Sequence, residues 1–322
     1  MRKNNRWDIS RMPDLTGKVV IVTGGNAGIG FQAARVFAGK GADTILACRN
    51  ELKGLKAVSK IKRRIPEARV KYMHLDLARL HSIKHFAENF SRDYSRLDIL
   101  LNNAGVILVP YKTTSDGFES QIGINHLGHF ALTGLLIDRI VHTEGARVVN
   151  VSSKAHRKGR MDFDNFHYPA GKGFSRIGGY TRSKLANLLF TYELDRRFRE
   201  ARIHALAVAV HPGYSYTDFG RAFVFRILRY IFYPVVVTVT QSSARGSLPS
   251  LRAAVDPEVQ GGDFYGPDGR GERKGFPVRV SSNGASHNKE DARRLWEISE
   301  KLTGVEYLDA SVLDTKINSI SL

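Results

Sequence analysis

The sequence predicts an α/β protein built on a doubly wound parallel sheet with helices on both faces. Short, continuous apolar runs alternate with segments whose apolar residues recur at helical spacing. Such runs suit strands that are buried on both faces, and their alternation with helices favours right-handed crossovers. Six of the runs end in polar or glycine residues, as expected where the carboxyl ends of parallel strands share one ligand crevice.

Each element follows from this alternation in turn. The predicted strands are residues 18–23, 42–48, 70–75, 97–101, 147–151 and 205–210. The predicted helices are residues 29–39, 52–65, 82–94, 122–140 and 180–198. Further on, we expect a short strand and turn within 261–267. A last helix is expected over 289–302, with Asn288 as its N-cap and Gly304 beyond its end.

Length and composition favour one globular domain. The 322 residues are 42% hydrophobic, which is ample for a large core. No linker-like tract interrupts the pattern, so we expect a single domain over 1–322, with a core over 15–217 and a variable substrate lobe over 218–322. The single cysteine, Cys48, excludes a disulfide framework. The opening residues lack the apolar stretch of a signal peptide, and we expect a cytoplasmic protein.

The net charge of +18 leaves several partners to consider: nucleic acid, an anionic membrane, or none. Zinc-finger, basic-zipper and RNA-recognition motifs are absent from the sequence. Much of the charge falls on the predicted helix 52–65, where a solvated helix face is the favoured interpretation. We therefore expect no nucleic-acid partner, although positive charge would help to attract a phosphorylated cofactor.

The turn between the first predicted strand and helix reads TGGNAGIG, with glycine at 24, 25, 28 and 30. Glycine allows backbone to approach a pyrophosphate closely, and a helix N-terminus offers N–H groups and a positive dipole to an anion. The spacing matches neither G-x-x-x-x-G-K-[ST] nor G-x-G-x-x-G. An ordinary glycine turn is the alternative, but the flanking strand and helix favour a phosphate site.

The residue that follows the second strand bears on the choice of cofactor. NAD-binding sheets usually place an acid there for the ribose hydroxyls, whereas an arginine suits a 2′-phosphate. This chain has Arg49 at that place, and a guanidinium pairs well with phosphate. The sequence therefore favours NADP(H) over NAD(H). Cys48, at the strand end, is interpreted as a small hydrophobic residue.

Tyr180 and Lys184 lie four residues apart, on one face of a predicted helix. A free phenol has a pKa of about 10, and a cation within ~4–6 Å lowers the pKa of an acid by about 1–3 units. Ser153, at the end of the fifth strand, could donate to a substrate carbonyl oxygen. Tyr168 and Lys172 share the spacing, but the intervening Pro and Gly disfavour a helix. No G-x-S-x-G elbow is present, which disfavours a hydrolase.

Taken in order, seven segments resemble the short-chain dehydrogenase/reductase family: TGGNAGIG, the aspartate of HLDL, NNAG, the asparagine of GINHLGHF, NVSS, YTRSK and HPG. The resemblance runs from about residue 15 to 217. It is nearest to the retinol-dehydrogenase-like branch, which includes WW-domain oxidoreductase-like and protochlorophyllide-reductase-like sequences. It implies a Rossmann-type fold and hydride transfer at C4 of a nicotinamide.

The resemblance also implies roles for individual residues. Ser153 would orient the carbonyl, Tyr180 would be the acid/base, Lys184 would bind the nicotinamide ribose, and Asn125 would hold a relay water. The implied cofactor contacts are Gly24, Asn26, Gly28, Ile29, Gly30, Arg49, Asp76, Leu77, Asn103, Ala104, Gly105, Tyr180, Lys184, Pro212, Gly213 and Thr217. The glycine loop lacks the basic residue of some NADP-preferring members, so the NADP preference depends chiefly on Arg49.

Two histidine pairs, His81 with His85 and His126 with His129, have helical spacing. Neither shows the H-E-x-x-H arrangement or an evident third ligand, so no metal is expected.

Residues 222–239 form the most apolar segment and contain Arg226, Arg229 and Pro234. Each arginine would cost about 3 kcal/mol at a bilayer centre, which disfavours a spanning helix. A lid over a lipophilic pocket is favoured over a helix lying in a membrane interface, and both imply a lipophilic carbonyl or alcohol. The direction of reaction is expected to be reduction. Homo-oligomerisation is left open.

Two other functions compete with the redox enzyme. The first is a catalytically idle dinucleotide-binding scaffold, which the intact Ser, Tyr and Lys disfavour. The second is a nucleotide-sugar epimerase, which the glycine spacing disfavours because that class usually carries T-G-x-x-G-x-x-G.

Overall fold

The protein, described here from a computed structural model over residues 6–214 and 241–307, contains one large sheet. The strands found in those residues are β1 (Val19–Thr23), β2 (Asp43–Cys48), β3 (Val70–His74), β4 (Ile99–Asn102), β5 (Ala146–Val151), β6 (Ala205–Val210), β7 (Phe264–Pro267) and β8 (Pro277–Arg279). Their spatial order is β3-β2-β1-β4-β5-β6-β7-β8. Neighbouring strands are parallel except β7 and β8, which are antiparallel.

This order places a topological switch between β1 and β4, since the chain moves outward from β1 to β3 and then returns to the other side of β1. Ligands of doubly wound sheets bind at such a switch, beyond the carboxyl ends of the strands. The strand order therefore marks the edge formed by Thr23, Asn102, Val151 and Val210 as the place for a site.

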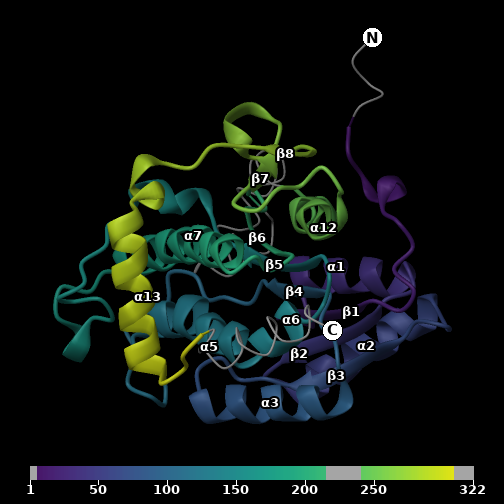
Figure 1. The fold of residues 1–322 in the computed structure, drawn as a ribbon, viewed down its shortest axis with the longest axis horizontal. Coiled ribbons are helices and arrows are strands. Elements are labelled where there is room, and N and C mark those ends of the chain that lie inside the picture. Colours follow the sequence, from purple (N-terminus) through teal and green to yellow (C-terminus); the bar gives the residue numbers. More distant parts are fainter. Residues whose placement is uncertain (1–5, 215–240, 308–322) are drawn as a thin grey trace, which may run out of the picture.

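Helices cover both faces of the sheet (Figure 1). The longer ones are α1 (Gly28–Gly39), α2 (Glu51–Arg64), α3 (Leu80–Asp93), α5 (Gly128–Leu135), α7 (Arg176–Glu200), α12 (Leu248–Val255) and α13 (Lys289–Thr303). The short ones are η1 (Ile9–Arg11), α4 (Ser120–Ile122), η2 (Gly123–Leu127), α6 (Ile137–Val141), η3 (Lys154–Lys158), η4 (Pro169–Gly171), α11 (Ser243–Gly246), η5 (Arg270–Glu272) and η6 (Gly284–His287).

Alternate residues of each strand serve two separate cores. On one face, Ile21, Leu100 and Val148 pack with residues of α3, α5 and α7. On the other face, Val20 and Val22 pack with residues of α1, α2 and α12. Successive side chains of a strand point to opposite faces, so a strand buried on both must be apolar throughout. The continuous apolar runs in the sequence have this cause.

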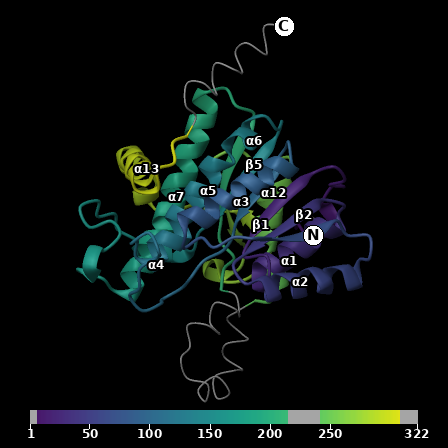
Figure 2. The ribbon, with the colours of Figure 1, turned by 90° about the horizontal axis from the view of Figure 1, so that it is seen from below.

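The C-terminal helix α13 forms an outer layer against α7 and α5 (Figure 2). Its Trp296 is 1% exposed and contacts the rings of Phe130 and Tyr307 at centroid distances of 5.3 and 4.5 Å. Gly134 of α5 makes room for Tyr307, because a Cβ there would lie 2.5 Å from that ring. As predicted, Asn288 caps α13 by accepting from the N–H groups of its first turn.

The predicted continuous helix over 122–140 is wrong. The chain there forms α4, a π-helical turn at η2, α5 and α6, with a break at Leu136 (φ −104°, ψ 3°). An extra residue in a helical turn re-aims side chains and is common at functional sites. Here the π-helical turn contains Asn125, whose side chain bonds the Val106 backbone.

Two expected features lie outside the described residues: the contact of Thr217 and the apolar segment 222–239. The residues that flank this span are described, and they lie side by side, because the Gln241 N–H donates to the Tyr214 carbonyl at 2.8 Å. Within the described parts of the chain, no helix has the length and apolarity needed to cross a membrane.

Candidate active site

A cleft of about 360 Å³ opens at the switch between β1 and β4, within the usual size range of ligand pockets. Its walls come from the ends of β1, β4, β5 and β6 and from α1 and α7. The residues that line it are Gly24, Asn26, Ala27, Gly28, Ile29, Gly30, Asn103, Ala104, Gly105, Val106, Ile107, Val109, Val151, Ser152, Ser153, Tyr180, Lys184, Pro212 and Gly213.

The glycine turn has the backbone that its sequence predicts. Gly24 and Gly28 adopt φ values of +67° and +57°, a region that L-residues with side chains rarely occupy. A Cβ at Gly30 would lie 2.5 Å from Nδ2 of Asn103 and 2.6 Å from the Gly24 carbonyl. Glycine is therefore required at all three positions, twice for conformation and once for close packing.

The N-terminus of α1 faces this cleft without a side-chain cap. Its N-cap residue, Ala27, has no side chain that can bond the first N–H groups, and Ala27, Gly28, Ile29 and Gly30 all line the cleft. A helix N-terminus is a ready anion site. The pyrophosphate of a dinucleotide fits this arrangement, because its oxygens would accept from the first N–H groups of α1, which no N-cap side chain bonds.

Thr23, at the end of β1, ties the glycine turn to the turn that follows β4. Its hydroxyl oxygen accepts from the N–H groups of Asn103 and Ala104, both at 2.9 Å. Nε2 of His129 lies 2.9 Å from the same oxygen, and Nδ1 lies 3.1 Å from the carbonyl oxygen of Asn125. A carbonyl only accepts, so Nδ1 carries the proton and Nε2 accepts the Thr23 hydroxyl. Burial lowers the pKa of His129 to about 4, consistent with a neutral ring.

Asn125 lies behind the wall of the cleft rather than on it. Its side chain is fully buried. Oδ1 accepts from the Val106 N–H at 2.8 Å, and Nδ2 donates to the Val106 carbonyl and the Ser183 hydroxyl at 3.0 Å each. These bonds fix the Gly105–Val106 segment, which does line the cleft. In the structure, the Asn125 side chain therefore shapes the wall.

Ser153, Tyr180 and Lys184 all line the cleft, from β5 and α7. The Ser153 hydroxyl caps η3 by accepting from the Ala155 N–H at 3.2 Å, which leaves its own hydrogen for another acceptor. Nζ of Lys184 donates to the Val151 carbonyl at 2.8 Å. Tyr180 is partly exposed and one helical turn from Lys184. A carbonyl group in the cleft would meet two hydroxyls beside an ammonium.

Arg49, Asp76 and Leu77 lie beyond the part of the cleft lined by the other residues. Nη1 of Arg49 lies 4.0 Å from Oδ1 of Asp76, and Nε of Arg79 lies 3.7 Å from Oδ2. Arg49 is 70% exposed. The Asp76 carboxylate therefore lies between two guanidinium groups at the edge of β2 and β3. Arg79 was not among the predicted residues, because it lies on no recognised motif.

Pro212 and Gly213 line the cleft on the β6 side, and Gly213 has φ +67°. The apolar residues Val106, Ile107, Val109 and Val151 line it as well, and sequence reasoning missed them. They lie next to polar or glycine strand ends, but their own apolar side chains look the same as core residues in the sequence. Ser152 was also missed, and its hydroxyl donates to the Lys184 carbonyl at 2.7 Å.

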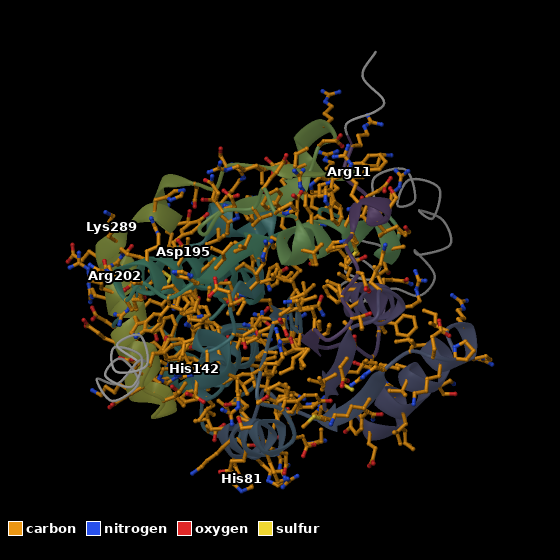
Figure 3. The ribbon with its side chains drawn as sticks, turned by 45° about the vertical axis from the view of Figure 1, so that its right-hand side comes forward. Arg11, His81, His142, Asp195, Arg202 and Lys289 are labelled. Atoms are coloured by element: carbon orange, nitrogen blue, oxygen red, sulfur yellow. The ribbon has the colours of Figure 1, made fainter. Side chains whose placement is uncertain are left out.

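The remaining candidates take structural positions. Cys48 is 7% exposed, and burial raises the pKa of its thiol to about 11, which suits a hydrophobic strand end. Tyr168 is buried and precedes the short turn η4 instead of lying on a helix. His81 projects outward from α3 (Figure 3), whereas His126 and His129 are buried.

Comparisons with known proteins agree with this geometry. Residues 18–224 match the family described as short chain dehydrogenase. Mouse retinol dehydrogenase 12 is 40% identical over 91% of this chain and 88% of its own length. Human WW domain-containing oxidoreductase is 38% identical over 90% of this chain and 69% of its own.

Solved structures have the same fold. An uncharacterised protein from Mycobacterium paratuberculosis is 36% identical, with a TM-score of 0.79 over 95% of this chain and all of its own. A short chain dehydrogenase from Shigella flexneri, complexed with NADP, is 21% identical, with a TM-score of 0.61 over 79% of this chain and 98% of its own.

Proposed function

The chain belongs to the short-chain dehydrogenase family, in the branch of the retinol dehydrogenases, and we propose that it is an NADP(H)-dependent reductase of lipophilic carbonyl compounds. Membership makes it an oxidoreductase that uses a nicotinamide dinucleotide and acts on alcohols or their carbonyl counterparts. The observation that carries the proposal is the joint presence of Ser153, Tyr180 and Lys184 on one cleft that also contains the N-terminus of α1.

The bound nicotinamide would supply or accept the hydride at the substrate carbon. The glycine turn and the N-terminus of α1 would hold the pyrophosphate, and Lys184 would hold the nicotinamide ribose. The Ser153 hydroxyl would donate to the carbonyl oxygen, so that charge developing on that oxygen is stabilised. Tyr180 would give the same oxygen its proton, with the Lys184 ammonium favouring the phenolate that results. Asn125 would act by fixing the Gly105–Val106 wall.

The preference for NADP(H) rests on Arg49 at the end of β2. Its guanidinium is exposed, and an arginine that follows the second strand of such a sheet suits the 2′-phosphate of NADP(H). Arg79 lies on the other side of Asp76, and we include it as a second cation for that phosphate. Reduction is the proposed direction, because NADPH is usually kept reduced in cells.

The lipophilic nature of the substrate rests on the apolar residues Val106, Ile107 and Val109, which line the same cleft as the proposed catalytic groups. Retinol dehydrogenases, named for an apolar alcohol, are among the relatives. We further propose a single domain over 1–322, in the cytoplasm or in peripheral contact with a membrane through 222–239.

Oxidation of NADPH with a panel of aldehydes and ketones tests the proposal. Tyr180→Phe is expected to lower kcat by about 10²–10⁴-fold, the usual contribution of a general acid, while NADPH still binds. Tyr168→Phe is the matched control, because Tyr168 has the same spacing to a lysine but lies off the cleft. Equal rates for wild type and Tyr180→Phe, or no turnover of any carbonyl by wild type, would favour the idle scaffold instead.

A further inference from the structure

Glu272 belongs to none of the sequence motifs of the cleft and lies on the short helix η5, between β7 and β8. Its two carboxylate oxygens join two segments of the cleft. Oε2 lies 3.0 Å from Nε2 of His211, which follows β6, and Oε1 lies 3.1 Å from Nη2 of Arg157, on the helix η3 that follows Ser153. Building on the proposed function, we infer that Glu272 is a positioning residue that sets the tautomer of His211 and thereby fixes the Pro212–Gly213 turn against the cofactor.

The hydrogen bonds of His211 determine its tautomer. Nδ1 lies 3.2 Å from the backbone nitrogen of Gly213, which can only donate, so Nδ1 carries no proton. Nε2 must then carry the proton and donate it to the Glu272 carboxylate. The ring is fully buried, and burial lowers the pKa of His211, which keeps the imidazole neutral. The Gly213 N–H is thus held by a ring that Glu272 orients.

The surrounding backbone is built closely around this ring. A Cβ at Gly266 of β7 would lie 2.1 Å from Nε2 of His211, so only glycine leaves space for the imidazole. The segment that follows Glu272 also bonds the Pro212–Gly213 turn, since the Tyr214 N–H donates to the Arg273 carbonyl at 2.8 Å. Gln241 completes the connection by donating to the Pro212 carbonyl and accepting from the Gly275 N–H.

Glu272 itself has a φ of +55°, in the left-handed region. A residue with a Cβ pays for this conformation, and such outliers concentrate where function requires a fixed geometry. The neighbouring Gly271, at φ +62°, adopts the same region without that cost. Glycine at position 272 would therefore adopt this backbone at lower cost. The glutamate adds a carboxylate, which bonds His211 and Arg157.

The charged and titratable groups that face His211 come from two elements, η5 and η3, and an aromatic ring of β7 packs on it as well. Glu272 approaches from η5, and His156, Lys154 and Arg157 approach from η3. From β7, the Phe264 ring lies 5.2 Å away, centroid to centroid. Glu272 is the anion in this group, so it both orients the neutral ring and would favour the imidazolium if a proton arrived. An imidazolium would carry a proton on Nδ1, opposite the Gly213 N–H, and would push the turn away.

Glu272→Gly tests the inference by separating binding from stability. The variant relaxes the backbone at residue 272 and removes the carboxylate. We expect Tm to stay within a few degrees of wild type while the Kd for NADPH, measured by fluorescence titration, rises about tenfold. Glu272→Gln keeps an acceptor for Nε2 and should restore most of the affinity. In that variant the loss of NADPH binding at low pH should move to lower pH, because the carboxylate no longer favours the imidazolium.

Two further variants sharpen the result. His211→Asn places an amide oxygen near the position of Nδ1, so it should retain more affinity than His211→Ala. Glu258→Gly is the matched control, since it removes an exposed carboxylate that pairs with Arg252. An unchanged Kd and an unchanged pH profile in both Glu272 variants would overturn the inference while leaving the proposed function intact. Failure of the wild type to bind either dinucleotide would instead defeat the proposed function.

Discussion

Individual residues in this cleft act through bonds that a sequence motif does not reveal. Tyr180, Lys184 and Ser153 line the cleft, where family resemblance expects them. Asn125 lies behind it and holds Val106. Arg49 is exposed and forms an ion pair with the Asp76 carboxylate. Hydrogen bonds therefore hold the wall of the cleft at Val106, whereas ion pairs across 3.7–4.0 Å hold Asp76 beyond the cleft.

Arg49→Ala is expected to raise the Kd for NADPH about tenfold and to leave the Kd for NADH unchanged. A hydrogen bond to a charged group contributes about 1.5–3 kcal/mol, and the exposure of Arg49 argues for the lower end of that range. Fluorescence titration with both cofactors measures the difference. Arg35→Ala serves as the control, because Arg35 bonds Gln32 on the outer part of α1. Equal losses for the two cofactors would refute the 2′-phosphate contact.

At the scale of elements, the cleft is formed by strand ends that are bonded to each other. Thr23 of β1 accepts from the turn after β4 and contacts His129 of α5, which in turn donates to the π-helical turn at Asn125. These partners are far apart in the sequence. One hydroxyl and one imidazole therefore connect the glycine turn, the NNAG turn and the helical segment η2–α5 that carries Asn125.

Thr23→Val is expected to destabilise the protein by about 2–6 kcal/mol. Valine has the shape of threonine but leaves the Asn103 and Ala104 N–H groups without their acceptor, and each unsatisfied buried group costs about 1–3 kcal/mol. Urea denaturation measures the free energy of unfolding. Thr23→Ser retains the hydroxyl and should lose much less. If both variants lost the same stability, the methyl group and not the hydrogen bonds would be responsible.

The sequence predicts elements best where burial is uniform. The strand over 205–210 is found with those bounds as β6, because a strand buried on both faces is apolar from end to end. The breaks in 122–140 could not be predicted, since apolar residues recur at helical spacing along the whole segment and Asn125 in the π-helical turn bonds Val106, a distant residue. The strand β8 was not predicted, because a strand of three residues at the edge of the sheet, paired with β7, is too short to show a recognisable apolar pattern.

The candidate site could be predicted only in part, for the same physical reason. Residues that contact a ligand through glycine backbone or through an acid/base side chain leave a local pattern. Residues that hold those groups in place, such as His129 and Glu272, act on partners distant in sequence and leave none. The apolar lining at Val106 and Ile107 is likewise indistinguishable from core until the fold brings it to the cleft.

The whole molecule buries several ionisable groups, and this determines how it responds to acid. Burial lowers the pKa of His126 to about 3 and that of His129 and His156 to about 4, from 6.5. Two buried carboxyl groups, those of Glu119 and Asp195, have raised pKa values for the same reason. Asp195, which is labelled in Figure 3, lies on α7 with its carboxylate close to Gly261.

Between pH 6.5 and about 4, the unfolded chain binds protons at these histidines that the folded chain does not. The free energy of unfolding should therefore be fully present above pH 6.5 and fall as the pH is lowered, by about 1.4 kcal/mol per pH unit for each histidine. The raised carboxyl pKa values oppose this fall near its acid end. Urea denaturation from pH 8 to 5 measures the slope.

A matched pair of variants isolates the contribution of one histidine. His126→Gln removes a buried ring and should make the pH dependence shallower. His81→Gln removes an exposed ring on α3 and should leave the dependence as in wild type. A stability that does not change between pH 8 and 5 in wild type would contradict the expectation.

The hydrogen bond between Gln241 and Tyr214 allows the length of the span between them to change at little cost in stability. The two ends of the span 215–240 are already joined next to the cleft, so changing the number of residues between them alters little of the closure entropy; a doubling costs only about 0.6 kcal/mol. Natural insertions, deletions or whole exchanges can accumulate there without disturbing the strands. A chimera carrying a span of different length from a relative should therefore keep the host's free energy of unfolding to within about 1 kcal/mol.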